Sequence, residues 1–449
     1  MSTPLSIALV SREYPPFFGG GIGTYARWII PALAAQGVRV HVITQAYDRT
    51  CPRVMTEGLV TTHRLPIGMG YGGWPNAAAR FSIHAGRLVA SLARTHRIQV
   101  AEYAECEAAS IASLLLDRHR PPTIVQLHTP SEQLFVLRSH TSQTLDVPHR
   151  YYFELERLGM HLADEILAPS QFIADWAHEQ YGFERPPSVI PYATGPLPPP
   201  PPPADESGGR IIFFAGRIEP RKGVESLIIA ANELMRTDPS VRLRLAGADT
   251  SGAPDGGSMR AYLQSMIGDH ARTRIQFLGR LNANEIRTEY TDASICAIPS
   301  LWENFPNTCI ESMSHARPVL VSDQGGMREM IGESVAGRTF IAGDPIDLQR
   351  VLAEMLNESR ESLAQRGRVA RTRIETMCNP IRVAKARIEH YCMVIDRRAR
   401  STPRTQSHGT FGAWKGIEDT LCGDIDSFDA PKVSGLVRQW IEQGAGCMR

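Results

Sequence analysis

Long apolar runs, paired cysteines and a large net charge are all missing from this chain of 449 residues. No apolar stretch reaches the roughly 18 residues that suggest a membrane-spanning helix, and the first residues carry no basic segment typical of a secretory signal. The eight cysteines include no C-x-x-C pair, which favours reduced thiols over disulfides or a zinc site. A formal net charge of +1 provides no field that would attract nucleic acid. We therefore expect a cytoplasmic protein that at most lies on the cytoplasmic face of a membrane.

What the chain does contain is an alternation of buried strands and helices. A strand predicted over Leu5–Ser11 is followed by the glycine-rich segment Phe17–Tyr25, a helix over Thr24–Gln36 and a strand over Val38–Thr44. This order is the opening of a doubly wound α/β domain. Glycines at a helix N-terminus let the backbone approach a ligand closely. A plain tight turn explains them equally well, because their spacing is not that of a dinucleotide-binding loop.

The proline-rich segment Pro196–Pro203 is the clearest boundary in the chain, because such a run is extended and stiff and cannot lie inside a sheet. After it, strands and helices alternate again through about six steps. The predicted fold class is α/β, with two Rossmann-like doubly wound domains and a C-terminal tail. The expected limits are 1–195 for the first domain, 196–209 for the linker, 210–380 for the second domain, 381–400 for the last helix and 401–449 for a tail of unknown role.

One segment of the second domain combines a strand end with a helix N-terminus. Ala293–Ile298 is predicted as a buried strand, and Pro306 predicts a helix that starts at Phe305 or Pro306 itself. The amides of Asn307 and Thr308 would then have no partner within the helix, and such amides bind anions or sugar hydroxyls.

Charged side chains flank this segment and a second strand end. Glu303 in the loop and Glu311 in the helix bracket the helix N-terminus. Arg217 and Lys222 project from the loop after the first strand of the second domain, just before a helix. A guanidinium, an ammonium and a helix dipole at the carboxyl end of a parallel strand can hold a diphosphate. The alternative is that these two residues and Arg221 are solvated loop charges.

Two features of the first domain admit both a functional and a plain interpretation. His128 follows a strand predicted over 123–127, at the sheet edge where α/β domains bind ligands, but it can equally be a hydrogen-bonded loop histidine. The helix predicted over 76–98 is amphipathic and basic, so it could contact an anionic membrane surface. Such a stripe is more often a solvated face. Its members are Arg80, His84, Arg87, Ser91 and Arg94.

Taken together, these motifs resemble those of the retaining glycosyltransferase family 4, also called glycosyltransferase group 1. The resemblance is carried by G-G-G-I-G-T-Y, H-T-P, G-R-I-E-P-R-K-G, A-G-A-D, F-L-G-R-L and P-S-L-W-E-N-F-P-N-T-C-I-E. It covers about 5–398 and is strongest over 213–322. It implies the GT-B fold, in which two Rossmann-like domains face each other across a cleft. The acceptor would lie on the first domain and the nucleotide-sugar on the second, and the last helix would return to the first domain.

The resemblance also implies roles for individual residues. Arg217 and Lys222 would hold the donor diphosphate, Glu303 would bind hydroxyls of the transferred sugar, and Glu311 would bind the ribose. His128 would contact the sugar near the reacting centre. The remaining donor-binding positions would be the amides of Gly21, Phe305, Asn307 and Thr308, together with the base-reading segment at Arg280 and Leu281.

Two positions depart from the family pattern. Pro306 stands where many members have glycine, which removes one donor amide beside the sugar. Tyr192 follows Pro191 at a position where asparagine is common, near the hinge between the domains.

We therefore predict a retaining hexosyltransferase that moves a sugar from a nucleotide-diphosphate donor to a hydroxyl of a glycan, glycolipid or small-molecule acceptor. Cations aimed at the departing diphosphate would make a metal or other cofactor unnecessary. The two glutamates would bind the donor rather than act as the acid and nucleophile of a glycosidase. Two alternatives stay open: a nucleotide-sugar epimerase or hydrolase of the same fold, and a catalytically inert nucleotide-sugar-binding protein. The sugar, the nucleotide and the acceptor do not follow from the sequence.

Overall fold

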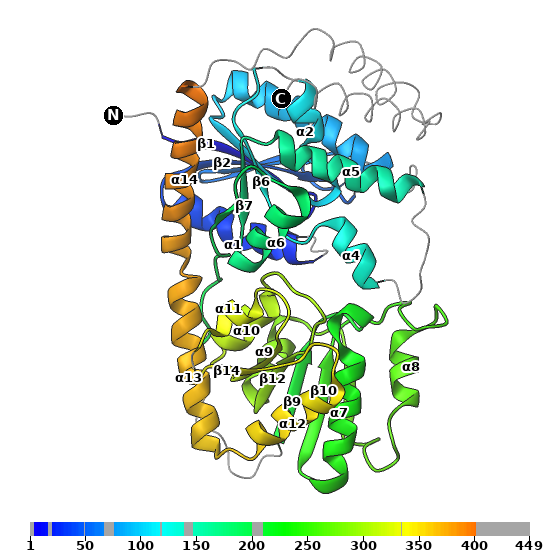
Figure 1. Cartoon of the computed structure of the whole chain (residues 1–449). Coiled ribbons are helices and arrows are strands. Elements are labelled where there is room, and N and C mark those ends of the chain that lie inside the picture. The colour runs from blue at the N-terminus through cyan, green and yellow to red at the C-terminus, as the bar shows by residue number, and fades with distance from the viewer. Residues whose placement is uncertain are drawn as a thin grey trace. The chain divides into compact units, whose positions relative to one another are not determined.

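A computed structural model describes residues 4–16, 20–48, 50–66, 76–116, 119–138, 147–199, 210–333 and 335–400. These residues form two compact units, each with its own sheet (Figure 1). The first unit takes in the described residues up to 132, from 147 to 167 and from 384 to 400. The second takes in those from 133 to 138 and from 168 to 383. The predicted tail 401–449 and most of the predicted linker lie outside the described residues, and the predicted domain limits stay predictions.

The first unit is built on a sheet with the strand order β3-β4-β2-β1-β5-β6-β7-β8. Neighbours from β4 to β7 are parallel, whereas β3 pairs antiparallel with β4. The strands are β1 Ser6–Val10, β2 Arg39–Gln45, β3 Val54–Glu57, β4 Val60–Leu65, β5 Val100–Ala104, β6 Thr123–Gln126, β7 Glu165–Ala168 and β8 Ser188–Val189. The helical segments are α1 Gly21–Ala35, α2 Asn76–Thr95, η1 Cys106–Ala108, α3 Ile111–Leu116, α4 Ser131–Arg138, α5 Val147–Leu162 and α6 Gln171–Tyr181. Of these elements, β8, α6 and all but the first two residues of α4 lie among the residues grouped with the second unit.

Helices cover both faces of the first sheet, with α2 and α5 on one face and α1 on the other (Figure 1). Phe81, Val89 and Leu92 of α2 are buried against Val10 and Ile43 of the sheet. Both faces of β1 and β5 are buried along their whole length. This explains why these strands read as continuous apolar runs rather than as alternating patterns.

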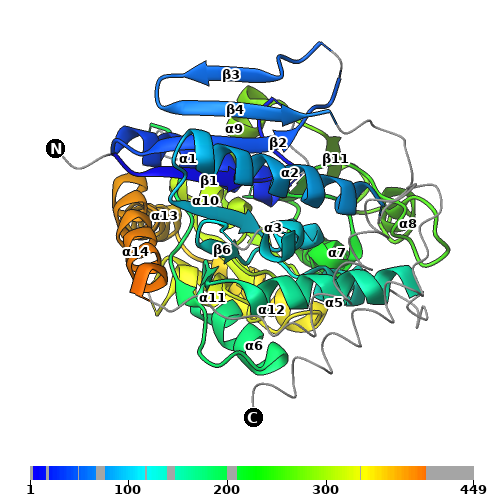
Figure 2. The ribbon, with the colours of Figure 1, turned by 90° about the horizontal axis from the view of Figure 1, so that it is seen from above.

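The β3–β4 hairpin was not predicted from the sequence. Figure 2 shows it at the edge of the first sheet, beside β2. Its outer strand β3 is short and mostly exposed, so it lacks the buried apolar pattern on which strand prediction depends.

The second unit is built on a sheet with the order β11-β10-β9-β12-β13-β14, in which every neighbouring pair is parallel. Its strands are β9 Arg210–Ala215, β10 Val241–Ala246, β11 Ile275–Gly279, β12 Ile295–Ile298, β13 Val319–Ser322 and β14 Gly337–Phe340. Its helical segments are η2 Pro220–Lys222, α7 Val224–Thr237, α8 Met259–Ser265, α9 Ala283–Asp292, α10 Asn307–Ser314, α11 Met327–Ile331, α12 Pro345–Leu356 and α13 Arg360–Met377, and α14 Pro380–Arg400 follows. This parallel order confirms the doubly wound prediction for the second domain.

Strand β9 is buried from both sides. Ile212 and Phe214 belong to the core formed with α7, α8 and α12. Phe213 points to the other face, because successive strand residues alternate. There its ring packs edge-on against Tyr290 of α9, with 5.1 Å between the centroids. The carboxyl-terminal half of β9 is therefore packed on both faces of the sheet.

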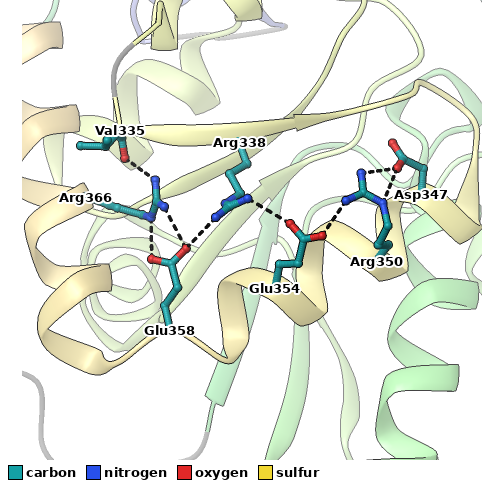
Figure 3. Close-up of polar contacts among 7 residues, drawn as sticks. All are labelled: Val335, Arg338, Asp347, Arg350, Glu354, Glu358 and Arg366. Atoms are coloured by element: carbon teal, nitrogen blue, oxygen red, sulfur yellow. Dashed lines mark hydrogen bonds and ion pairs between the residues drawn. The ribbon is translucent and has the colours of Figure 1, made fainter.

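Helices α12 and α13 are separated by a short break, because α12 ends at Leu356 and Ser359 caps α13 by accepting from the amide of Ser362. A network of ion pairs joins β14 to both helices beside this break (Figure 3). Arg338 bridges Glu354 and Glu358, and Arg366 binds both oxygens of Glu358 at 2.7 and 2.9 Å. Paired hydrogen bonds of this kind fix geometry as well as adding energy, so we regard the network as structural.

The last helix, α14, belongs to the first unit from Ala384 onward. Near its end, Arg397 pairs with Glu165 of β7 at 2.7 Å, and Arg398 pairs with Asp164 at 3.2 Å. None of the described helices is long and apolar enough to span a membrane.

Candidate active site

Two loops of the second unit meet because the strands that precede them are neighbours. Strands β9 and β12 pair in parallel, so the loops that follow both strands leave the same edge of the sheet. Gly223 has φ +64, and a Cβ atom there would lie 1.9 Å from the carbonyl oxygen of Pro299. The amide of Leu301 donates to the carbonyl of Arg221 at 2.8 Å. The loop that carries Lys222 is thus fastened to the loop that carries Glu303.

Glu303 is the centre of a buried ion cluster. Its Oε1 atom accepts from Nη1 of Arg221 at 2.9 Å, from Oγ of Ser300 at 3.3 Å and from the Lys222 ammonium. Within the described part of the chain, every hydrogen bond of this carboxylate goes to Oε1. The second oxygen, Oε2, is therefore the one that can accept from a ligand. The cluster brings together the predicted residues Lys222 and Glu303.

Arg217 joins the cluster through a second carboxylate. Glu219 is buried, and its Oε1 accepts from Nη2 of Arg221 at 2.9 Å and from Nη2 of Arg217 at 3.2 Å. The Arg217 side chain itself is 46% exposed, which leaves most of its guanidinium donors open to a ligand.

Arg221 is the residue whose role the sequence analysis missed. It entered there only as a member of a basic cluster that could be solvated, whereas its side chain is 7% exposed and bridges Glu219 and Glu303. The solvated-loop alternative is therefore wrong for Arg221. No spacing rule indicated this, because the burial depends on the approach of the β12 loop.

The charges in this cluster decide its protonation state. Burial by itself would raise the pKa of Glu303, but the adjacent Lys222 ammonium and Arg221 guanidinium outweigh burial and hold that pKa at about 2. Burial also lowers the pKa of Lys222, and Glu303 opposes this. Glu303 is thus a carboxylate at every physiological pH and can act as a hydrogen-bond acceptor without first losing a proton.

Helix α10 begins directly after the Glu303 loop. Pro306 is its capping residue, with φ −70 and ψ 129, and the first helical residue is Asn307. The prediction that the helix starts at Phe305 or Pro306 is corrected by one residue, because Pro306 keeps an extended ψ. Asn307 and Thr308 therefore lie in the first turn, whose amides cannot reach a carbonyl within the helix. Phe305 is buried and packs edge-on against Tyr192, with ring centroids 5.5 Å apart.

Glu311 lies one turn into α10 and is half-buried. Its Oε2 accepts from the Tyr290 hydroxyl at 2.9 Å, and burial raises the pKa of this carboxyl while that hydrogen bond lowers it. Tyr290 is itself held between the ring of Phe213 and the stacked ring of His315. No hydrogen bond or ion pair links Glu311 to Arg217 or Lys222 in the described ranges, so Glu311 shares the sheet edge with the ion cluster without contacting it.

The predicted base-reading residues follow another strand of the same sheet. Arg280 is exposed and Leu281 half-buried, directly after Gly279 at the end of β11. Strands β11 and β9 are both neighbours of β10. Because all three strands are parallel, Arg280 and Leu281 leave the sheet at the edge that carries Lys222.

The predicted residues of the first unit also lie at the carboxyl edge of their sheet. His128 follows β6, is 7% exposed, and donates its backbone N–H to Oε1 of Glu105 at 2.7 Å. Gly21 is the first residue of α1, four residues before Tyr25, whose ring packs edge-on against the His128 imidazole with 5.1 Å between centroids. The same helix end is approached by Glu13, whose Oε2 accepts from the amide of Gly23 at 3.3 Å. The sequence analysis did not anticipate this carboxylate.

Glu105 and Glu156 form a second group that sequence reasoning missed. Burial raises the pKa of each carboxyl to about 8, and for Glu105 the nearby Glu156 adds to the effect. Glu156 accepts from the amide of Glu107 and from Ser131, which ties η1 to the start of α4. The Oε2 atom of Glu105 is buried and has no hydrogen-bond partner among the described residues. In the part of the chain that is described, no three side chains of histidine, cysteine, aspartate or glutamate are grouped to hold a metal ion.

Comparison with known proteins covers most of the chain. The family model "Glycosyl transferase 4-like domain" matches residues 20–193, and "Glycosyl transferases group 1" matches residues 201–373. Glycogen synthase of Mycobacterium tuberculosis is 24% identical over 432 residues, which is 89% of this chain and 97% of that protein.

Solved structures agree with these matches. Sucrose-phosphate synthase of Thermosynechococcus elongatus aligns with a TM-score of 0.72 at 20% identity, over 88% of this chain and 100% of that one. The HepE protein of Anabaena, solved with UDP and glucose, aligns with a TM-score of 0.60 at 18% identity, over 86% and 98% of the two chains. The GT-B fold class predicted from the sequence is confirmed. The chain is a glycosyltransferase and belongs to the group 1 glycosyltransferases, also called glycosyltransferase family 4.

Proposed function

We propose that this enzyme moves a hexosyl unit from a nucleotide-diphosphate sugar to a hydroxyl of a glycan, lipid or small-molecule acceptor, with retention at the anomeric carbon. The observation that carries the proposal is the ion pair between Lys222 and Glu303 at the adjacent ends of β9 and β12. An ammonium has three N–H donors. With one donor on Glu303, two remain for diphosphate oxygens, while Oε2 of Glu303 remains for a sugar hydroxyl. The ion pair between Lys222 and Glu303 would thus bind both the diphosphate and the sugar of the donor.

The chemical step follows from where charge develops. When the bond between the anomeric carbon and the phosphate oxygen breaks, its electron pair leaves with the diphosphate, and positive charge develops on the sugar. Lys222 and Arg217 are fixed cations beside the departing group, and such preorganised charges stabilise a transition state most effectively in a site that excludes water. We therefore propose that the step needs no metal ion.

Retention would follow if the acceptor attacks from the face that the diphosphate leaves. The acceptor oxygen then bonds to the anomeric carbon, and its proton passes to an oxygen of the departing phosphate. In this scheme Glu303 accepts a hydrogen bond from the sugar and forms no covalent bond with it.

The other predicted residues have supporting roles in the proposal. Glu311 would bind the ribose hydroxyls, and the backbone of Arg280 and Leu281 would contact the base. From the first unit, Gly21 would donate its amide to the diphosphate, and His128 would contact the transferred sugar. The remaining amides of the site are those of Phe305, Asn307 and Thr308. The UDP in the HepE structure supports a nucleoside diphosphate as the leaving group.

A binding screen followed by a transfer assay tests the proposal. Calorimetry of the full chain against UDP-, GDP- and ADP-sugars identifies the nucleotide, and a labelled donor with a panel of acceptors then measures transfer in the presence of a chelator. We expect Arg217→Ala and Lys222→Ala to lower turnover by orders of magnitude. The matched control is Arg236→Ala, an exposed arginine in the last turn of α7, which should leave turnover unchanged.

Three outcomes would count against the proposal. Near-normal transfer in both variants would remove the assigned roles of Arg217 and Lys222. Release of free sugar, or its epimerisation without any acceptor, would favour a hydrolase or epimerase. Saturable nucleotide binding with no transfer to any acceptor would favour an inert binding protein.

The same proposal includes a peripheral contact between α2 and an anionic membrane surface. The helix contains no acidic residue, and His84, Arg87 and Arg94 are exposed on it. Cosedimentation with phosphatidylserine vesicles should fall when Arg87 and Arg94 are changed together to glutamate. Equal sedimentation of both proteins would leave α2 as an ordinary solvated helix.

A further inference from the structure

A buried arginine from the last helix reaches the strand that His128 follows. Arg387 of α14 has no exposed surface. Its Nη1 donates to Oε2 of Glu102 at 2.8 Å and its Nη2 to Oε1 of Gln126 at 2.5 Å. A buried guanidinium is costly unless its charge is paired, so this placement needs the partners that the first sheet provides.

Glu102 is the counter-charge and gathers further donors. Besides Arg387, it accepts from the hydroxyl of Tyr391 at 2.5 Å and from the hydroxyl of Tyr25. These four side chains come from β5, α1 and α14, and three of them have 2% exposure or less, with Tyr25 at 3%. The arrangement is thus a single buried unit in which one carboxylate neutralises one guanidinium.

This unit touches His128 through Tyr25. The guanidinium of Arg387 lies 5.0 Å above the ring of Tyr25, and the same ring packs edge-on against the imidazole. Gln126, which binds Arg387, is the last residue of β6 and lies two residues before His128 along the chain. Displacement of the Arg387 side chain would therefore shift the ring that supports the imidazole.

The charges around the imidazole favour its neutral form. Burial first, and the Arg387 charge second, lower the pKa of His128 to about 3. The titratable and charged groups around it come from β5, the turn directly after β5, α1, α5 and α14. They are Glu102, Glu105, Tyr25, Glu156, Arg387 and Tyr391.

We propose that Arg387 is a positioning residue for His128: it fixes Tyr25 against the imidazole and keeps a positive charge near it, which helps the imidazole to stay uncharged. This inference rests on the proposed function, in which positive charge develops on the sugar that His128 contacts. A charged imidazolium at that place would oppose the developing charge, because like charges in a water-poor site repel strongly. A neutral imidazole can still exchange hydrogen bonds with the sugar.

Histidine titration tests the proposal without any need for activity. In the full chain with isotope-labelled histidine side chains, the His128 signal is identified by its loss in His128→Gln. We expect no titration of this signal between pH 5 and 8 in the unchanged protein. In Arg387→Met the pKa of His128 should rise above its value in the unchanged protein, because the second cause that lowers it is gone. It should stay below the ordinary value of about 6.5, because the imidazole is still buried. In Arg387→Lys, which keeps the charge, the His128 signal should titrate as it does in the unchanged protein.

The pH dependence of kcat/KM gives the second readout. Arg387→Met should lose more activity at pH 5.5 than at pH 8, because a raised His128 pKa leaves a larger fraction of the imidazole charged at the lower pH. Glu102→Gln, which leaves the positive charge in place, should add no such acid limb. If Arg387→Met does not fold, the double variant that combines Glu102→Gln with Arg387→Met removes both charges together. We expect the same rise in the His128 pKa in that double variant.

Two results would overturn the inference. One is an unchanged His128 titration in Arg387→Met or in the paired variant. The other is an equal loss of kcat/KM at every pH, which a merely structural role would produce. Failure of the proposed function is distinguishable, because the unchanged protein would then show no transfer while the histidine titrations could still differ as expected.

Discussion

Arg221 and Glu303 are joined by a hydrogen bond of 2.9 Å between Nη1 and Oε1, and both residues are buried. The same oxygen receives the Lys222 ammonium. Two cations therefore share one carboxylate oxygen. If Lys222 turns two of its donors toward a diphosphate, Arg221 still holds Glu303 in place and in its ionised form.

This relationship predicts the behaviour of Arg221→Met. With one of its two cations gone, the pKa of Glu303 should rise from about 2, because burial then meets less opposition. Protonated Glu303 cannot accept through that oxygen, so the acid limb of kcat/KM should move to higher pH. Breaking a buried pair typically costs about 3–5 kcal/mol, so the melting temperature should fall as well.

Arg221→Lys provides the matched comparison. It keeps a charge but cannot span Glu219 and Glu303 with one planar group. Compared with Arg221→Met, we expect the acid limb of kcat/KM to return part of the way to its original pH and the melting temperature to recover less. An acid limb that stays in place in Arg221→Met would show that Lys222 alone sets the protonation of Glu303.

A second prediction concerns the close approach of Gly223 to Pro299. In Gly223→Ala the new methyl group would lie 1.9 Å from the Pro299 carbonyl oxygen, so the Lys222 loop must move away from the Glu303 loop. We expect both the melting temperature and donor binding to fall. Gly182→Ala is the control, because Gly182 has the same φ of +64 with no atom within 4 Å of the added Cβ. It should show only the conformational cost of about 1 kcal/mol. Equal effects of the two changes would mean that the loops can separate without harm.

A third prediction separates ribose binding from diphosphate binding. Glu311→Gln should weaken binding of the preferred nucleoside diphosphate about tenfold or more, since hydrogen bonds to a charged group contribute about 1.5–3 kcal/mol. The corresponding 2′- and 3′-deoxynucleotides should bind the variant and the unchanged enzyme more nearly alike. Tyr290→Phe removes the hydroxyl that orients Glu311 and should give a smaller change of the same kind. If calorimetry shows that Glu311→Gln distinguishes the nucleotide from its deoxy forms as well as the unchanged enzyme does, the ribose is bound by another group.

A fourth prediction concerns how the stability of the first unit changes between pH 5 and 8. The pKa of Glu105 is raised from 4.5 to about 8. An acid whose pKa is raised on folding contributes stability that is fully present below its unfolded value near 4.5 and is lost as pH rises toward 8. The melting temperature should therefore fall between pH 5 and 8.

Glu105→Gln should flatten this profile, because its amide oxygen can still accept from the backbone of His128 while no charge has to be buried. Glu156 has a raised pKa in the same window, so some slope should remain. The control is Glu57→Gln on exposed β3, which should leave the profile unchanged. Identical slopes for Glu105→Gln and the unchanged protein would mean that the Glu105 carboxyl does not titrate in this window.

Sequence alone determined the alternation of strands and helices, because parallel strands buried on both faces leave continuous apolar runs and each helix needs its own apolar stripe. It also placed the candidate site residues Arg217, Lys222 and Glu303 in loops after predicted strands, and the carboxyl ends of parallel strands lie at one edge of a sheet. The edge hairpin β3–β4 and the break between α12 and α13 escaped prediction, because neither leaves a periodic apolar signal.

Only the tertiary structure decided which charges meet. Arg221 is 82 residues from Glu303 along the chain, and Arg387 is 285 residues from Glu102. Glu303 lies in the loop after a neighbouring strand, and Arg387 lies on a returning helix. Sequence spacing carries no record of either proximity. Burial, which sets the pKa values of Glu303, Glu105 and His128, is likewise a property of the packed neighbours. The residue types were readable from the sequence, but their protonation states and partners required the fold.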